Sequence, residues 1–265
     1  MNLGLSNARV VVTGGASNIG RGIVHRFAGE GSRIVISDID EPQAEKVRAE
    51  ALERGAAAVE LAIADLTAPD GAEVAIGQAV SSWGGIDVLV NNAGWSVPGF
   101  IATDTDREKW QRTIEINLFT AIAATQCAIG PMKDAGGGSI VFIASDAAFG
   151  QIRQGVYGAS KAAMVALART TAREHGRHGI RSNIVCPGLV IPDGPDAVGA
   201  SSLWAVGEDE VFNPKQIDFM LKDTPLRRLT TADDIGHAVL WFASPIAARQ
   251  VTGQMISVSG GYTMP

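Results

Sequence analysis

The fold of this 265-residue chain is decided by residues 13–20, which read Thr-Gly-Gly-Ala-Ser-Asn-Ile-Gly. This stretch directly follows a short apolar run at residues 9–13 and leads into a segment of helical composition at residues 18–28. In such a strand–turn–helix unit, glycines permit a tight turn and let the backbone approach a pyrophosphate group, which the free N–H groups of the helix N-terminus then bind. On its own the stretch is a weak signal, because a glycine-rich turn before a helix can also be purely structural.

Further apolar runs recur along the chain and alternate with helical segments. Most are continuous Val/Ile/Leu runs, as strands buried on both faces of a parallel sheet require. The expected strands are residues 9–13, 33–37, 58–62, 86–90, 139–144, 182–186 and 254–258. The expected helices are residues 18–28, 41–54, 71–83, 106–133, 157–175 and 231–243. This order predicts an α/β chain of Rossmann type, a doubly wound, seven-stranded parallel sheet with helices on both faces and a ligand crevice at the carboxyl ends of the strands.

Residues 189–225 interrupt the alternation, because they contain no expected strand and are punctuated by proline and glycine. Loops of this length are commonly functional lids. The apolar residues of the 189–225 segment could form a lid over a hydrophobic substrate or, alternatively, an oligomer contact. They are Leu203, Trp204, Val206, Phe212, Ile217, Phe219, Met220 and Leu221. With no repeat or linker in the sequence, we expect one domain over residues 1–265 with a substrate lid at about 189–225.

Composition excludes several classes of protein. With 46% hydrophobic and 19% charged residues the chain is globular, and a net charge of -6 offers no basic surface for nucleic acid or an anionic membrane. Cys127 and Cys186 lie in apolar segments and are expected to be core thiols, while His175 and His178 lack partners at metal-binding spacing. No signal-peptide pattern and no membrane-length apolar run occurs, so we expect a soluble, cytoplasmic protein without a metal site.

An acidic residue follows the second expected strand, about 20 residues beyond the glycines. Asp38 is placed to accept hydrogen bonds from the ribose hydroxyls of an adenosine, and its charge would repel a 2′-phosphate. Neither Ser17 nor Ile39 supplies a cation beside it. The sequence therefore favours NAD over NADP as the cofactor.

Other strand ends carry motifs that together identify a family. Asp65-Leu66 follows the third strand, Asn91-Asn92-Ala93-Gly94 the fourth, and Pro187-Gly188 the sixth. With the Thr-Gly-x-x-x-x-Ile-Gly turn and the pair Tyr157-x-x-x-Lys161, the chain resembles the single-domain branch of the short-chain dehydrogenase/reductase family from Ala8 to its end. The resemblance implies an oxidoreductase that interconverts a secondary alcohol and a ketone by hydride transfer, assembled as a homotetramer.

Tyr157 and Lys161 lie one helical turn apart, and Tyr157 is one of only two tyrosines. A phenol has a pKa near 10 and acts as a base at neutral pH only when a nearby cation stabilises the phenolate. Lys161 supplies that charge, so Tyr157 is the predicted acid/base. By resemblance, Ser145 hydrogen-bonds the substrate oxygen, Lys161 also holds the nicotinamide ribose, and Asn117 holds a water that links Lys161 to solvent. The other tyrosine, Tyr262, lies near the terminus and is available as a comparison mutant.

The same resemblance predicts which residues contact the dinucleotide. They are Gly14, Ser17, Asn18, Ile19, Asp38, Ile39, Asp65, Leu66, Asn92, Ala93, Gly94, Tyr157, Lys161, Pro187, Gly188 and Val190. Asn18 replaces a glycine of the family turn, and asparagine tolerates the left-handed backbone conformation that the turn needs. Pro192 replaces a threonine that contacts the carboxamide in relatives, which leaves the backbone of Val190 for that contact.

The substrate is indicated only locally. Residues 143–148, 172–175, 178–180, 185–188 and 257–261 resemble those of bacterial 2-hydroxycyclohexanecarboxyl-CoA dehydrogenases, which favours a cyclic or β-hydroxyacyl-CoA-type alcohol. A free hydrophobic alcohol or ketone is the alternative. A non-catalytic dinucleotide sensor would be a different class of function on the same fold.

Overall fold

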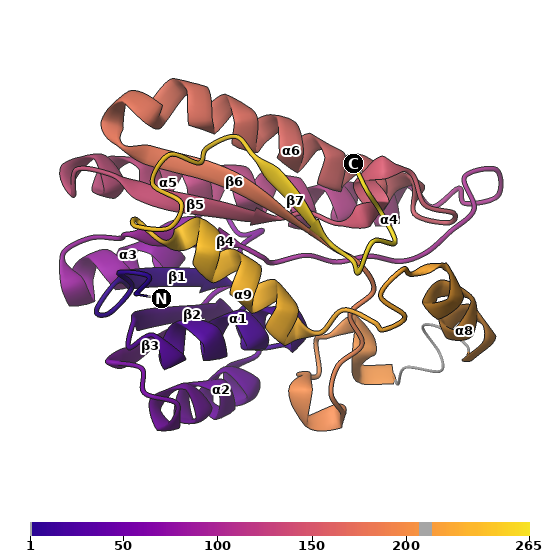
Figure 1. Cartoon of the computed structure of the whole chain (residues 1–265), viewed down its shortest axis with the longest axis horizontal. Helices are drawn as coiled ribbons and strands as arrows, with labels where there is room; N and C mark the ends of the chain where they lie inside the picture. The colour runs from indigo at the N-terminus through magenta and orange to yellow at the C-terminus, as the bar shows by residue number, and fades with distance from the viewer. Residues whose placement is uncertain (1, 207–213) are drawn as a thin grey trace.

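The structure is a computed structural model that describes residues 2–206 and 214–265. Its centre is a seven-stranded sheet in the order β3-β2-β1-β4-β5-β6-β7 with every neighbouring pair parallel (Figure 1). The strands are β1 (Arg9–Thr13), β2 (Arg33–Asp38), β3 (Ala58–Ile63), β4 (Val88–Asn91), β5 (Gly138–Ile143), β6 (Ile180–Pro187) and β7 (Met255–Val258). The predicted fold class is confirmed.

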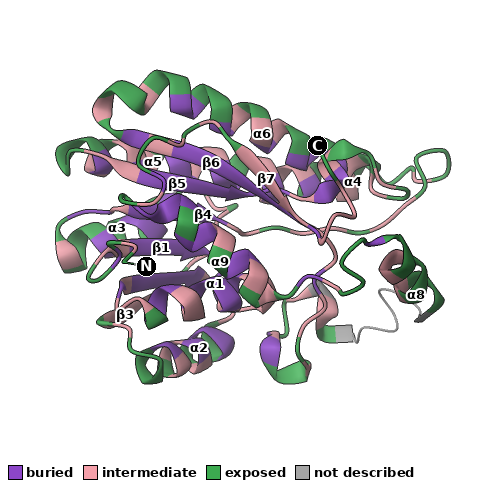
Figure 2. Ribbon diagram, in the orientation of Figure 1, coloured by how far each residue is buried: buried purple, intermediate pink, exposed green. Residues whose placement is uncertain are grey.

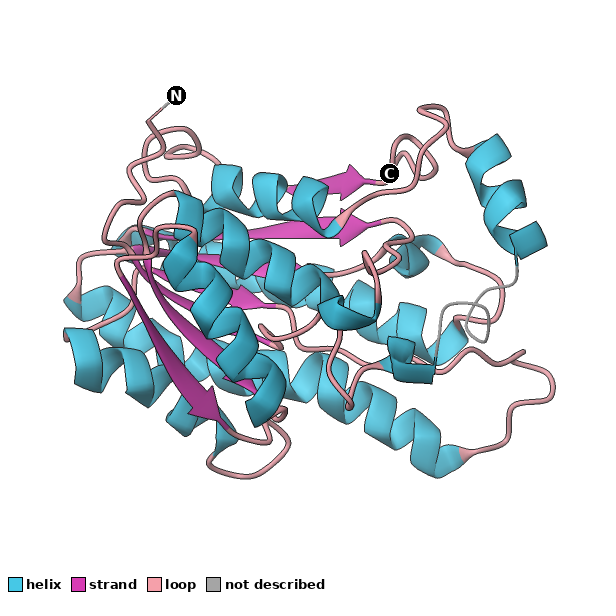
Figure 3. Cartoon of the chain, turned by 90° about the horizontal axis from the view of Figure 1, so that it is seen from below, coloured by secondary structure: helices cyan, strands magenta, loops and turns pink. Residues whose placement is uncertain are grey.

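Helices cover both faces of this sheet (Figure 3). The long helices are α1 (Asn18–Gly29), α2 (Glu41–Glu53), α3 (Gly71–Trp83), α4 (Arg107–Ile114), α5 (Thr120–Asp134), α6 (Gly155–His175), α8 (Pro214–Asp223) and α9 (Ala232–Ala243). Successive side chains of a strand point to opposite faces, so Val10 and Val12 pack in the core formed with α1, α2 and α9, whereas Val11 packs in the core formed with α3, α5 and α6. The inner strands β1, β2, β4, β5 and β6 are accordingly mostly buried, whereas the edge strands β3 and β7 are only partly buried (Figure 2).

The helix expected over residues 106–133 is interrupted in the structure. A π-helical segment, η1 (Glu115–Phe119), lies between α4 and α5 and contains Asn117. One extra residue in the turn rotates the helix face, and π-helical turns of this kind occur often at functional sites. The apolar pattern of the sequence continues through the segment and gave no sign of it.

The segment at residues 189–225 contains more regular structure than expected. The structure places α8 in it, together with the short 3₁₀ turns η4 (Pro195–Ala197) and η5 (Leu203–Val206). Its first half is anchored to the glycine-turn end of the molecule, because the backbone N–H of Gly199 donates to Ser17 Oγ (2.9 Å) and Lys46 Nζ donates to the carbonyl of Asp196 (3.0 Å). Phe212, expected in the lid, lies outside the described residues.

The two cysteines are free thiols, with Cys186 fully buried and Cys127 half-buried. Burial raises the pKa of Cys186 to about 12, as expected of a thiol in the core. Within residues 2–206 and 214–265, no helix combines the length and the apolar character needed to cross a bilayer.

Candidate active site

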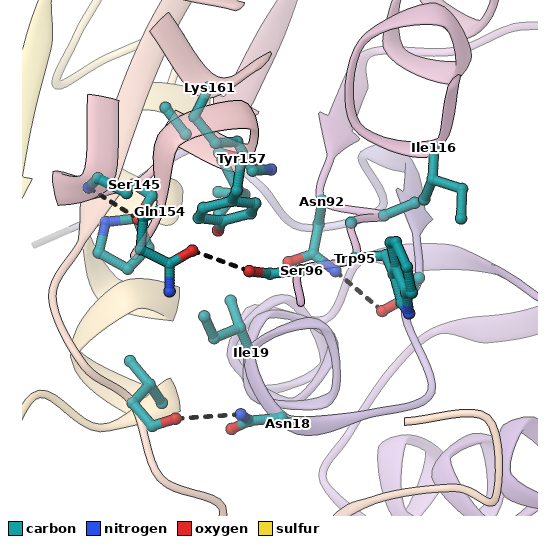
Figure 4. Close-up of a pocket in the computed structure, with 18 of the residues that line it drawn as sticks. Asn18, Ile19, Asn92, Trp95, Ser96, Ile116, Ser145, Gln154, Tyr157 and Lys161 are labelled. Carbon is teal, nitrogen blue, oxygen red and sulfur yellow. Dashed lines mark hydrogen bonds between the residues drawn. The ribbon is translucent and has the colours of Figure 1, made fainter. Parts of the chain in front are cut away.

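A cavity of about 1950 Å³ opens at the carboxyl ends of the strands, where the sequence predicts the ligand crevice. Figure 4 shows part of its lining, with Asn18 and Ile19 at one end and Ser145, Tyr157 and Lys161 at the other. Of the predicted catalytic and cofactor-binding residues, every one lines this cavity except Asn117. The topology therefore brings side chains from distant parts of the chain to one surface.

The glycine turn has the shape that a dinucleotide needs. A Cβ at Gly20 would overlap the carbonyl oxygen of Gly14, and a Cβ at Gly14 would lie 2.9 Å from the Cα of Ala93, so both glycines are required by close backbone contacts. Asn18 adopts a left-handed φ of 42°, as predicted. Its Nδ2 donates to the carbonyl of Val190 (3.3 Å), which ties the turn to the start of the 189–225 segment. The Val190 carbonyl, which we expected to face the carboxamide, therefore already accepts a hydrogen bond from Asn18. The sequence did not indicate this contact.

Asp38 lies at the end of β2 with its carboxylate fixed by the backbone. Its Oδ2 accepts from the N–H of Ala16 (2.9 Å), and its Oδ1 accepts from the N–H groups of Ile39 (2.8 Å) and Asp40 (3.1 Å). Burial raises the pKa of Asp38, while the three N–H donors favour its ionised form. The carboxylate is thus held in one orientation at the wall of the cavity. The residues present fit an adenosine ribose, with Asp38 beside the cradle formed by the glycine turn.

Ser145, Tyr157 and Lys161 come together where β5 ends and α6 begins (Figure 4). Ser145 hydrogen-bonds the phenol of Tyr157, and its Oγ also accepts from the N–H of Ala147 (3.1 Å). Lys161 is buried, donates from Nζ to the carbonyl of Ile143 (2.9 Å), and lies with Nζ 5.7 Å from the centre of the Tyr157 ring. A phenol, a hydroxyl and an ammonium group within one cavity can move a proton to and from a substrate oxygen.

The protonation of this group depends on charge inside the cavity. Burial raises the pKa of Tyr157, since the phenolate is poorly solvated there, and the hydrogen bond from Ser145 opposes that effect. Burial also lowers the pKa of Lys161 to about 8. Tyr157 can therefore serve as a base near neutral pH only if positive charge beside it outweighs its burial.

Asn117 lies behind the cavity wall rather than in it. Its fully buried side chain accepts at Oδ1 from the N–H of Trp95 (2.9 Å) and donates from Nδ2 to the carbonyl of Trp95 (2.7 Å). Gly94 allows this approach, because a Cβ there would lie 2.9 Å from Asn117 Oδ1 and 3.2 Å from Lys161 Nζ. Asn117 therefore fixes the backbone of Trp95, the residue after Gly94, and its role in carrying a water stays a prediction.

Comparison with known proteins identifies the family. The sequence model described as Enoyl-(Acyl carrier protein) reductase matches residues 14–263. The (2S)-[(R)-hydroxy(phenyl)methyl]succinyl-CoA dehydrogenase subunit BbsD of Thauera aromatica is 35% identical over 264 residues, which cover 99% of this chain and 99% of that protein. The chain belongs to the short-chain dehydrogenase/reductase family. It is accordingly an oxidoreductase that acts on CH–OH groups.

Two further matches concern another dehydrogenase of this short-chain family. The 7alpha-hydroxysteroid dehydrogenase of Escherichia coli K12 is 34% identical over 98% of this chain and 96% of that protein. A solved structure of 7α-hydroxysteroid dehydrogenase complexed with NADH and 7-oxo glycochenodeoxycholic acid has a TM-score of 0.88 at 34% identity, covering 98% of this chain and 96% of that one. The cofactor in that solved structure is therefore a nicotinamide dinucleotide.

The structure adds cavity residues that the sequence reasoning missed. Tyr262, Thr263 and Met264 line the cavity, so a comparison mutant at Tyr262 lies within the site. These residues follow β7, and the rule that ligands bind at the carboxyl ends of strands could have found them. In this dehydrogenase Ser96 also donates to Gln154 Oε1 (3.0 Å), which joins the loop after β4 to the start of α6 (Figure 4).

Proposed function

We propose that this short-chain dehydrogenase/reductase uses NAD(H), with Tyr157 as the acid/base. The observation that carries the proposal is that one cavity contains both the Asp38 carboxylate and the Ser145, Tyr157 and Lys161 side chains. When bound, the nicotinamide ring supplies the hydride acceptor for oxidation and the hydride donor for reduction. In oxidation Tyr157 takes the hydroxyl proton of the alcohol while Ser145 donates to the same oxygen, and in reduction Tyr157 returns the proton.

Replacing Asp38 by asparagine tests the preference for NAD. The isosteric Asp38→Asn change removes the charge that repels a 2′-phosphate. It keeps one acceptor oxygen for the backbone N–H groups and replaces the other with an NH2 group. We expect the ratio of kcat/KM for NAD to kcat/KM for NADP to fall by about tenfold or more, since one charge–charge contact of this kind is commonly worth at least 1.4 kcal/mol. Asp40→Asn, at the neighbouring acid in the same cavity, is the matched control. An unchanged ratio in Asp38→Asn would show that Asp38 does not determine the preference for NAD over NADP.

We further propose a hydrophobic secondary alcohol or ketone as the substrate, with a cyclic or β-hydroxyacyl-CoA type favoured. The cavity is lined by large apolar side chains, several of them exposed to solvent, which a bulky apolar substrate would cover. They are Trp95, Val97, Phe149, Ile152, Phe219, Met220 and Met264. The 35% identity with a dehydrogenase of an aromatic acyl-CoA supports the CoA thioester, whereas the 34% identity with a hydroxysteroid dehydrogenase supports a free alcohol.

A screen with matched substrates separates the two types. Cyclic and β-hydroxy acids, their CoA thioesters and free hydrophobic secondary alcohols are each incubated with enzyme and NAD, and NADH absorbance is followed. We expect kcat/KM for the favoured CoA thioester to exceed that of its free acid by about 100-fold or more, because interactions with remote parts of a substrate contribute to catalysis. Equal rates for acid and thioester would favour the free alcohol. NADH binding without turnover of any compound would favour the non-catalytic sensor.

We also propose that the protein is a homotetramer. β7 is the last strand of the sheet and pairs only with β6, so within the described residues its outer edge has no strand partner. Proteins rarely leave such an edge open, and a symmetric contact with a second copy would cover it. Light scattering coupled to size exclusion should give the mass of four chains, and a monomer mass at working concentration would contradict the proposal.

A further inference from the structure

Asp146, the residue after Ser145, carries a buried carboxyl group that the proposed chemistry does not use. Only 1% of its surface is exposed, and its Oδ2 has no hydrogen-bond partner. Its Oδ1 lies 3.0 Å from Ser257 Oγ at the end of β7. In the described part of the chain no cation forms an ion pair with it. A buried carboxylate with one oxygen unpaired is costly, so its protonation state matters to the structure around it.

Ser257 is the first member of a hydrogen-bonded chain that leads to the cavity. Its Oγ lies 2.9 Å from Ser259 Oγ, and Ser259 Oγ lies 3.2 Å from the carbonyl oxygen of Thr263. The N–H of Thr263 also donates to Ser259 Oγ (3.1 Å). Thr263 lies between Tyr262 and Met264, and we call these three cavity-lining residues the C-terminal wall. Asp146 is thereby connected to one wall of the site.

Counting protons shows which form of Asp146 completes this chain. The three contacts Asp146–Ser257, Ser257–Ser259 and Ser259–Thr263 O need one proton each, because every hydrogen bond needs a donor. The two serine hydroxyls supply two protons, and a carbonyl oxygen supplies none. All three contacts are satisfied together only if the carboxyl of Asp146 donates the third. When Asp146 is ionised, Ser257 donates to its carboxylate and Ser259 donates to Ser257. No proton is then left for the contact between Ser259 Oγ and the carbonyl of Thr263, and a negative charge is left buried.

The two glycines just before the C-terminal wall, Gly260 and Gly261, contact the chain at the end of the 189–225 segment. The N–H of Leu226, just beyond α8, donates to the carbonyl of Gly260 (3.0 Å), and a Cβ at Gly261 would lie 2.8 Å from Cγ of Pro225. A change in the hydrogen bonds of Ser259 therefore affects both the C-terminal wall and the residues that follow α8. Both α8 and the wall line the substrate side of the cavity.

We propose that Asp146 is a positioning residue, whose carboxyl holds the C-terminal wall of the substrate cavity in place while it carries a proton and loosens that wall when it ionises. The proposal rests on the proposed assignment of this cavity as the active site, but it places no step of the reaction on Asp146. It adds a carboxyl group that controls substrate binding from beside the catalytic serine.

The surroundings of Asp146 raise its pKa toward the pH range in which enzymes commonly work. Burial raises the pKa of Asp146 to about 6, against the opposing effect of the hydroxyls of Ser257, Thr263 and Ser259. The titratable groups that face it are the thiol of Cys186 on β6 and the phenol of Tyr262, and Tyr262 in turn faces Asp223 at the end of α8. The first two are neutral at that pH. The C-terminal wall should therefore be held in place by the complete hydrogen-bonded chain at pH values below about 6, and should loosen at higher pH.

Three variants test the proposal. Asp146→Asn copies the protonated acid, because its amide donates to Ser257 Oγ and cannot ionise. Asp146→Ala removes the first contact at every pH, and Ser257→Ala removes both the first and the second while leaving the carboxyl in place. The readouts are KM for substrate, kcat and the dissociation constant of NADH, each measured from about pH 5 to about pH 8, where the group titrates. Dividing each wild-type value by that of Asp146→Asn cancels the pH dependence that both enzymes share, including that of Tyr157.

We expect the wild-type KM, relative to Asp146→Asn, to rise about fivefold across pH 6, which corresponds to one buried hydrogen bond of about 1 kcal/mol. Asp146→Ala and Ser257→Ala should show the raised KM at every pH, and NADH affinity should change by less than about twofold. A KM ratio that stays flat would overturn the proposal. So would an Asp146→Ala enzyme whose kcat and NADH affinity fall together while KM stays constant. If the alanine variants do not fold, the comparison with Asp146→Asn decides alone.

A stability measurement keeps this test separate from the proposed function. Because the pKa of Asp146 rises from 3.8 to about 6 on folding, the folded protein binds more protons than the unfolded chain in that window. The unfolding free energy of wild type should therefore fall relative to Asp146→Asn as pH rises through the window, and stay lower above it. Parallel stability curves would overturn the proposal even in a protein with no measurable activity.

Discussion

Tyr157→Phe is expected to lower kcat by about 10³-fold or more while leaving the affinity for NADH within about twofold. The change removes only the phenol oxygen that hydrogen-bonds Ser145, and the ring keeps its packing next to Lys161. Without that oxygen no group beside Ser145 can take the alcohol proton in oxidation or return it in reduction. The rate is measured as NADH formation with the best substrate of the screen, and NADH binding is measured by fluorescence.

Tyr262→Phe is the matched control, because it removes the only other phenol of the chain from the same cavity. Tyr262 lies in the C-terminal wall, so a change in KM is expected there, with a loss of kcat far smaller than that of Tyr157→Phe. If both variants lost kcat to the same extent, the effect would belong to the cavity wall and not to the chemistry of Tyr157.

Lys161→Ala is expected to lower kcat/KM by about 10²-fold or more and to move the pH dependence of oxidation to higher pH. Lys161 is buried next to Tyr157, and a positive charge at that position favours the phenolate, which burial disfavours. Removing the charge raises the pKa of Tyr157 further, so a higher pH is needed to form the phenolate. Rates across pH and the melting temperature are the two measurements.

Added methylammonium provides the control for Lys161→Ala. A small cation that enters the space left by the side chain should restore part of the rate and return the pH profile toward that of wild type. The folded state should not be lost, because removing a buried charge also removes its desolvation cost. A variant with an unshifted pH profile would contradict the role of Lys161 as the cation that activates Tyr157.

The sheet could be predicted from the sequence because burial on both faces leaves a plain mark, the continuous apolar run. The π-helical segment at Glu115–Phe119 could not, because one extra residue in a helical turn changes hydrogen bonding without changing composition. Helix α8 was missed for the opposite reason. Pro214 begins it, a position where proline suits a helix, but the prolines and glycines around it suggest a loop.

The site divides in the same way. Gly14, Asp38, Tyr157 and Lys161 were predictable because each lies directly after a strand or at a fixed helical spacing, where local sequence determines position. Asp146 and Ser257 were not recognised as partners, since their contact joins two segments 111 residues apart and depends on how the chain end packs. Contacts of this long-range kind are set by packing and leave no periodic pattern.

A spectroscopic titration of the phenols tests the central claim most directly. With only two tyrosines in the chain, the phenolate absorbance resolves into Tyr157 and Tyr262, and Tyr157→Phe identifies which is which. Burial raises the pKa of both phenols in the protein alone. With NAD⁺ added, one phenol should titrate at about pH 7 to 8, near the working pH of an acid/base group, and this titration should be absent from Tyr157→Phe. Two phenols that both still titrate at about pH 10 or higher, the range of an ordinary tyrosine, would contradict the account.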